Sequence, residues 1–217
     1  MLGTGIPSYL FPAAQQQVNS SLAGILNSLS PLFTLLLGLV FFRSSFTWSK
    51  TLGISIGLLG ALSLFLFGEK TGLSGNWHYG LLIVLACLCY AISSNLVGHR
   101  IEGLKALTIT SVSFSLVGIP ALVYLLLGTD FVATLQSTPA AWQGVGYITV
   151  LALFSTVLAG VIFFYLIQMT NPVFGSTVSY LVPAVALCWG AFDGEAITIA
   201  HYTGMGLILL GVYLSRN

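Results

Sequence analysis

Polar side chains that could bind a solute are embedded in long apolar stretches of this 217-residue chain. Asn27 stands shortly before Pro31, and Tyr180 stands shortly before Pro183. Burying an unpaired amide or hydroxyl group against lipid costs on the order of 1–3 kcal/mol, so we expect these groups to line a wetted central cavity. The candidate substrate-binding residues are Gln16, Asn27, Pro31, Tyr90, Asn95, Tyr165, Gln168, Tyr180 and Pro183. The alternative is that such groups only hydrogen-bond between helices or to carbonyls of their own helix.

The sequence contains no comparable set of residues for acid–base catalysis or metal binding. The acidic side chains are few and scattered along the chain, whereas catalysis needs a converging acid, base or metal set. Cys87 and Cys89 have poor metal-ligand spacing and no His or carboxylate close by in the sequence. We therefore expect no catalytic residue, no metal and no cofactor. No carboxylate falls in the middle of a predicted helix, where proton relays usually lie, so coupling lies outside these helices or transport is facilitated or exchange-type.

The composition is that of a membrane protein. Charged residues make up 5% of the chain, hydrophobic residues make up 57%, and the mean hydropathy is +1.00. A soluble domain carries about 25% charged residues. The net charge of +1 provides no basic patch for nucleic acid. We expect a small-molecule solute and membrane lipids as partners, and no nucleic acid; no oligomeric state is predicted.

The elements that must position the polar groups are membrane-spanning helices, so the predicted fold class is an all-α polytopic bundle. The apolar runs are continuous and lack the alternation of a β-barrel. Pro31 and Pro183 fall inside two of the helices, where proline removes a backbone hydrogen bond and bends the helix. The expected helices are Gly3–Val18, Ser21–Phe42, Lys50–Phe67, Tyr79–Gly98, Ala106–Gly128, Ala141–Met169, Pro172–Phe192 and Thr198–Leu214.

An internal repeat relates the two halves of the chain. Residues of the first half recur 152 positions later, and after one deletion two glycines recur 151 positions later. The repeated pairs are Phe11 and Phe163, Gln16 and Gln168, Asn19 and Asn171, Leu29 and Leu181, Pro31 and Pro183, Leu35 and Leu187, Gly38 and Gly190, Gly53 and Gly204, and Gly60 and Gly211. We assign residues 1–67, with three helices, to the first repeat and residues 76–217, with five, to the second. The difference predicts that roughly two helices of the first repeat are missing, and an odd number per half makes the repeats inverted, as in transporters.

Basic residues and glycines indicate orientation and packing. In the predicted topology five basic residues share one side and only Lys70 lies on the other, so the first side is cytoplasmic by the positive-inside rule. This places the C-terminus in the cytoplasm and the chain in a membrane of the bacterial inner-membrane type. The five basic residues are Arg43, Lys50, Arg100, Lys105 and Arg216. The glycines that we expect to let helices approach closely, and not to contact solute, are Gly53, Gly57, Gly204 and Gly211.

Two stretches resemble the EamA-type repeat of the drug/metabolite transporter superfamily. They run from Ser21 to Leu64 and from Gly175 to Leu214, and the second is the closer match. The pattern is a helix with a central proline, a Gly-Glu at its end, a short loop and a final helix with spaced glycines. In the second stretch the matching residues are Gly194, Glu195, Gly204 and Gly211. The first departs from the pattern, because Arg43-Ser44-Ser45 stand where the Glu is expected.

The resemblance implies ten helices in a 5+5 arrangement, both chain ends in the cytoplasm and a central cavity between the halves. Members of this superfamily export or exchange amino acids, metabolites and drugs. We therefore predict a secondary transporter of small organic metabolites or drugs that works by alternating access. The alternative is an integral-membrane enzyme acting on a lipid-linked substrate, which the scattered acidic residues disfavour. A purely structural membrane subunit is a weaker third reading, since it would not need kinked helices at symmetric positions.

Overall fold

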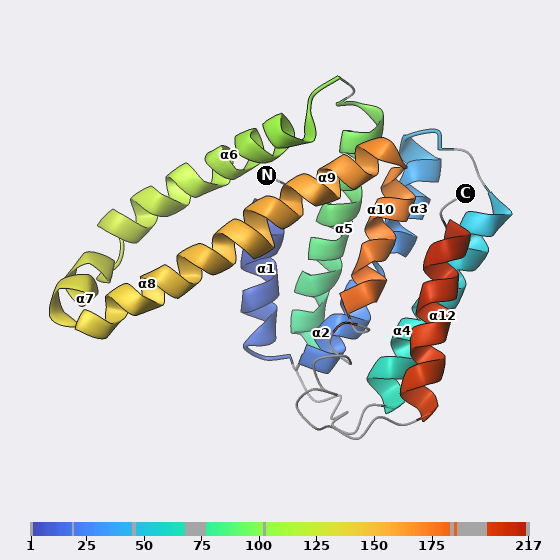
Figure 1. Cartoon of the computed structure of the whole chain (residues 1–217), viewed down its shortest axis with the longest axis horizontal. Helices are drawn as coiled ribbons and strands as arrows, with labels where there is room; N and C mark the ends of the chain where they lie inside the picture. The colour runs from blue at the N-terminus through green and yellow to red at the C-terminus, as the bar shows by residue number, and fades with distance from the viewer. Residues whose placement is uncertain are drawn as a thin grey trace.

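The computed structural model describes residues 2–18, 20–44, 47–67, 77–101, 103–182, 185 and 199–215, which fold almost entirely into helices (Figure 1). Pro183 and the Gly194-Glu195 pair lie outside these residues. In chain order the elements are α1 (Gly5–Gln15), α2 (Ser20–Asn27), α3 (Ser30–Phe41), α4 (Trp48–Phe67), α5 (Trp77–His99), α6 (Ala106–Leu127), α7 (Phe131–Ser137), α8 (Pro139–Leu151), the π-helical segment η1 (Ala152–Leu158), α9 (Ala159–Met169), α10 (Pro172–Ser176), the 3-10 segment η2 (Thr177–Tyr180) and α12 (Ile199–Ser215).

Among the described residues, three helical stretches are long and apolar enough to cross a membrane. They are His78–His99, Ala106–Leu127 and Pro139–Met169, with mean hydropathies of 2.1, 1.9 and 2.5. The second has 22 residues and is therefore about 33 Å long, which matches a hydrocarbon core of about 30 Å. The predicted fold class, a polytopic membrane helix bundle, is confirmed.

Helix α5 lies at the centre of the bundle. It packs against α1, α2, α3, α9 and α10, and Figure 1 shows these helices grouped around it. On the α1 side, Ile83 and Cys87 pack with Ala14 in a buried cluster. Nearer its C-terminal end, Val97 packs with Ile167 of α9 in another. A side chain on α5 therefore faces elements from both ends of the sequence.

Helices α4 and α12 lie side by side and run antiparallel (Figure 1). A methyl group added at Gly53 would lie 2.7 Å from the carbonyl oxygen of Gly211, and one added at Gly60 would lie 2.8 Å from that of Gly204. Such contacts between backbones are possible only without side chains. Near the chain's C-terminal end the Ser49 hydroxyl donates to the carbonyl of Leu214 at 2.7 Å. The expectation that Gly53, Gly57, Gly204 and Gly211 serve helix packing is confirmed, and Gly60 takes part in the same contact.

The α6–α8 hairpin extends away from the helices grouped around α5, with α7 at its tip (Figure 1). Most of its large apolar side chains are exposed. In each of the spans Ala106–Leu127 and Pro139–Met169, only 11% of an apolar window of 18 residues is buried. Near its base α6 packs against α9. This exposure suits a surface that meets hydrocarbon.

The structure corrects three details of the predicted helices. The helix expected from Ser21 to Phe42 is broken into α2 and α3, the short helix α7 was not predicted, and η1 interrupts the helix expected from Ala141 to Met169. The break precedes Pro31, whose ring cannot donate the backbone hydrogen bond of a continuous helix. The α2–α3 break, η1 and η2 are three interruptions within apolar helices. They mark positions where backbone groups can face another element or a ligand.

Candidate functional site

The break between α2 and α3 directs backbone acceptors toward α5. Leu29 N–H donates to the carbonyl of Leu26 at 3.1 Å, which tightens the last turn to an i to i+3 pattern. Pro31 has no N–H for the carbonyl of Asn27, its partner in a regular helix. Across the interface the Cys87 thiol lies 3.5 Å from the Leu26 oxygen and 4.0 Å from that of Asn27. A thiol is a weak donor, so these carbonyls keep most of their capacity to accept hydrogen bonds.

The second repeat leaves α-helical geometry at the corresponding place. Segment η2 has 3-10 geometry over Thr177–Tyr180, and Tyr180 corresponds to Ser28 in the 152-residue repeat. The hydroxyls of Ser176 and Thr177 donate back to carbonyls of their own helix, each at 2.7 Å. Both proline-bearing helices are thus irregular just before the position of the proline, as discontinuous transporter helices are.

A row of polar groups follows the contact between α3 and α5, and we call it the α3–α5 seam. The residues that α5 contributes to it are spaced four or eight positions apart, so they lie on one face of that helix. On the first-half side are Asn27, Ser30, Thr34, Gly38 and Ser44, and on α5 are Cys87, Asn95 and His99. The seam runs from the α2–α3 break to the end of the bundle that carries Arg43 and Arg100, which we call the basic end.

Asn95 is the central polar side chain of the seam. It is fully buried, and its Nδ2 donates to the carbonyls of Thr34 and Ala91, both at 2.9 Å. Its Oδ1 is buried and has no hydrogen-bond partner among the described residues, as is also true of Ser30 Oγ. A buried acceptor left unpaired costs about 1–3 kcal/mol. A methyl group on Gly38 would lie 3.0 Å from this Oδ1, so the glycine keeps room beside it.

His99 joins the seam to the basic end. Its Nδ1 lies 3.1 Å from the Asn95 carbonyl oxygen and its Nε2 lies 3.1 Å from Ser44 Oγ. Because a carbonyl only accepts, the neutral ring carries its proton on Nδ1, and Ser44 donates to Nε2. The Phe42 ring packs beside the imidazole, with centroids 5.6 Å apart. His99 therefore bridges α5 and the segment after α3 and is not simply a solvated helix-end side chain.

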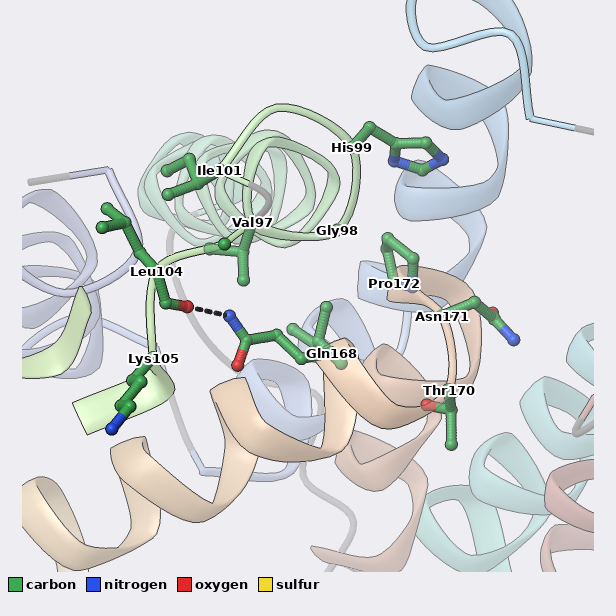
Figure 2. A pocket seen from close by; sticks show the side chains of 12 residues that line it. Val97, Gly98, His99, Ile101, Leu104, Lys105, Gln168, Thr170, Asn171 and Pro172 are labelled. Carbon is green, nitrogen blue, oxygen red and sulfur yellow. Dashed lines mark hydrogen bonds between the residues drawn. The ribbon is translucent and has the colours of Figure 1, made fainter. Parts of the chain in front are cut away.

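A pocket of about 590 Å³ opens beside His99, between the α5–α6 loop and the α9–α10 turn (Figure 2). Gln168 Nε2 donates to the carbonyl of Leu104 at 2.7 Å and ties α9 to this loop. Gly103, with φ +92°, permits the turn of the loop. The volume lies within the 300–1,000 Å³ typical of small-molecule sites.

The structure brings two of the predicted site residues, Asn27 and Asn95, together along the seam. Pro31 is buried in the first turn of α3, directly after the α2–α3 break. Gln168 lies at the pocket instead, and Tyr90 packs near Phe11 of α1, with ring centroids 6.1 Å apart.

The other predicted site residues lie away from the seam and the pocket. Gln16 is exposed at the end of α1, and Tyr165 is 57% exposed on α9. Tyr180 is fully buried, packs on Gly57, and donates its hydroxyl to the carbonyl of Ile54 at 3.2 Å. Their roles in substrate binding, like that of Pro183 outside the described residues, stay predictions.

Several seam residues were not singled out from the sequence. Thr34, Gly38, Ser44, Cys87 and His99 received no role, although Cys87, Asn95 and His99 are spaced at multiples of four within one apolar helix. That spacing is a signal for a shared face. Within the part of the chain that the structure describes, no group of three or more His, Cys, Asp or Glu could hold a metal ion.

Comparison with known proteins gives a consistent result. The profile of the EamA-like transporter family matches residues 1–66 and 78–216. An uncharacterized transporter of Archaeoglobus fulgidus is 25% identical over 215 residues, which is 99% of this chain and 74% of that protein. The uncharacterized inner membrane transporter YedA of Escherichia coli K12 is 28% identical over 205 residues, 93% of this chain and 63% of that protein.

Two further comparisons give a relative that is named for its substrate and a solved structure with the same fold. An S-adenosylmethionine/S-adenosylhomocysteine transporter of Chlamydia trachomatis serovar L2 is 24% identical over 208 residues, 92% of this chain and 63% of that protein. A solved crystal structure has a TM-score of 0.76 at 16% identity and covers 98% of this chain and 72% of that one. The chain thus spans between 63% and 74% of the length of these relatives, and its fold is shared with a protein of known structure.

Proposed function

Because this chain belongs to the EamA-like transporter family, we propose that it moves a small organic solute across the cytoplasmic membrane by alternating access between two inverted repeats. The repeats are residues 1–67 and 76–217. The family and the named relatives are transporters and not enzymes, so an enzyme acting on a lipid-linked substrate is not retained as a candidate.

The observation that carries the proposal is the reciprocal contact between α4 and α12. Gly53 corresponds to Gly204 and Gly60 to Gly211 in the repeat, yet Gly53 contacts Gly211 and Gly60 contacts Gly204. Such an exchange, in which residue i meets j and j meets i, is what a two-fold axis produces. Antiparallel equivalent helices support an axis in the membrane plane, the arrangement on which alternating access is built.

The α3–α5 seam is the proposed solute site. It lies where the first repeat meets α5, the first helix of the second repeat. It holds unpaired acceptors at Ser30 and Asn95, and weakly paired carbonyls at the α2–α3 break. A solute with N–H or O–H donors would satisfy them. The Chlamydia relative named for S-adenosylmethionine supports a polar organic solute as the substrate class.

The basic end is proposed to face the cytoplasm. Arg43 and Arg100 lie at this end, as does Ser49 of α4, whose bond to Leu214 brings the C-terminal end of α12 there. Short loops rich in Arg and Lys remain on the cytoplasmic side. A relative is named an inner membrane transporter, which supports the same membrane for this chain.

This orientation predicts that a reporter fused after Asn217 lies in the cytoplasm. A C-terminal alkaline phosphatase, active only outside the cytoplasm, should give no activity, whereas a C-terminal green fluorescent protein should fluoresce. The matched control carries the phosphatase in the α7 region after Gln136, at the opposite end of α6, where activity is expected. The reverse pattern would contradict the orientation.

Transport itself is tested by measuring fluxes in cells that carry the full-length gene. We expect uptake or export of one solute class to change at least severalfold relative to an empty vector. The first solutes to test are S-adenosylmethionine, amino acids, nucleobases and common drugs. Unchanged fluxes for all of them, with the protein present in the membrane fraction, would contradict the proposal.

A further inference from the structure

The pocket at the basic end has a rigid frame. A methyl group added at Gly98 would overlap the ring of Pro172, and one added at Gly175 would lie 2.6 Å from Ile167. These contacts lock the end of α5 against α9 and α10, while Gln168 holds the α5–α6 loop in place. The pocket is therefore preformed, which avoids the free energy of ordering its walls when a ligand binds.

The chemistry of the lining favours a ligand that is anionic and partly apolar. Val97, Ile101 and Ile167 contribute apolar surface, and Lys105 is the one charged group among the lining residues that the structure describes. Figure 2 shows Lys105 beside the Gln168–Leu104 contact at one side of the pocket.

Asn171, on another side of the pocket, also offers a donor. Its Oδ1 already accepts from Phe174 N–H at 2.9 Å, so the free part of the amide is its Nδ2 donor. The available donors are thus the Lys105 ammonium at one side of the pocket and the Asn171 amide N–H at the other (Figure 2). Of the two, the ammonium is the charged group that suits phosphate oxygens.

The surroundings of the pocket favour a lipid over a soluble anion. Leu104 lines the pocket and is 50% exposed. Leu107 in the first turn of α6 and Met169 at the end of α9, each close in the sequence to lining residues, are 60% and 67% exposed. Arg100, in the same loop as Lys105, adds positive charge; Glu102 of this loop lies outside the described residues. Basic groups just cytoplasmic of a membrane helix attract anionic headgroups.

We propose that this pocket binds the phosphate headgroup of an anionic phospholipid, with Lys105 as its charged partner. The acyl chains follow the apolar surface formed by Leu104, Leu107 and Met169. The lipid would hold α5, α6 and α9 together at the membrane surface, at the end where His99 contacts Ser44. The inference depends on the chain spanning a membrane, and it goes beyond the transport function, since no transported solute takes part in it.

The test is lipid retention by the purified full chain, measured by native mass spectrometry after exchange into neutral detergent. Equal amounts of phosphatidylglycerol and phosphatidylcholine are supplied, and we expect the anionic lipid to be retained preferentially. Lys105→Gln should reduce that preference about fivefold, since one basic residue near the surface contributes about 1 kcal/mol. Lys50→Gln is the matched control, because it removes the same charge at the basic end but outside the pocket lining, and it should leave the preference unchanged.

A second variant separates the pocket from general surface charge. Thr170→Trp fills the pocket from its rim and keeps every charge, so it should also lower retention of phosphatidylglycerol. Equal retention of the two lipids by the wild-type chain, or equal losses in Lys50→Gln and Lys105→Gln, would overturn the proposal. Displacement of the bound lipid by millimolar inorganic phosphate would also overturn it, because the site would then be one for a soluble anion. Flux measurements do not enter this test, so its failure and that of the transport proposal are distinguishable.

Discussion

Gly211→Ala is expected to lower the free energy of unfolding by about 3 kcal/mol. The added methyl group would overlap the backbone nitrogen of Gly57 and lie 2.6 Å from the carbonyl oxygen of Gly53. Both neighbours are backbone atoms, so the contact can be relieved only by moving α4 away from α12. Overpacking of this kind typically costs 1–3 kcal/mol and sometimes more. Thermal unfolding of the purified protein in detergent measures the effect.

Gly206 provides the control on the same helix. A methyl group added there meets nothing within 4 Å among the described residues. Alanine is favoured over glycine in a helix interior by up to about 1 kcal/mol, so Gly206→Ala should be neutral or stabilising. Equal unfolding temperatures for the two variants would show that α4 and α12 do not pack as closely as the structure places them.

The close packing of α4 and α12 was largely predictable, because the spacing of glycines along the sequence is enough to indicate it. The spacing of Gly53, Gly57, Gly204 and Gly211 predicted close helix packing. The internal repeat showed that the helix with Gly53 corresponds to the helix with Gly204. The pairing of specific glycines depends on the antiparallel arrangement and came only from the structure. A proline signal behaved in the same way, since Pro31 predicted a bend and the structure places a full break ahead of it.

The candidate site was less predictable because these helices are apolar on every side. A soluble helix shows which face is buried by its polar stripe, whereas hydropathy along α5 does not distinguish the side facing α3 from the side facing α1. Tyr180 and Asn95 both read as polar groups in apolar helices. The structure buries the Tyr180 ring against Gly57 and pairs its hydroxyl with the carbonyl of Ile54, whereas Asn95 keeps an unpaired buried acceptor.

Asn95→Leu is expected to abolish most transport while leaving the fold intact. The carbonyls of Thr34 and Ala91 lie within helices and keep their backbone partners when Nδ2 is removed. Loss of the unpaired Oδ1 removes a desolvation cost of about 1–3 kcal/mol, which offsets the two lost hydrogen bonds and the extra volume of leucine. We expect the free energy of unfolding to change by less than about 1 kcal/mol. We expect flux to fall about tenfold, the equivalent of one hydrogen bond of about 1.4 kcal/mol to the solute.

The comparison that makes this result interpretable is Thr110→Val. Thr110 is also buried, but its hydroxyl donates to the carbonyl of Ala106 in its own helix at 2.8 Å, on the side of α6 that faces α9. This variant should lose at most about 1.5 kcal/mol of stability and keep its flux. Asn95→Ala, which adds no volume, guards against overpacking beside Gly38 and should also lose transport.

Normal flux in a folded Asn95→Leu protein would remove the seam as the solute site, and unfolding of both Asn95 variants would make Asn95 a structural residue. Asn95 variants that fold but do not transport would instead support the solute as the hydrogen-bond partner of Asn95 Oδ1. That role would explain why the chain keeps a buried acceptor unpaired.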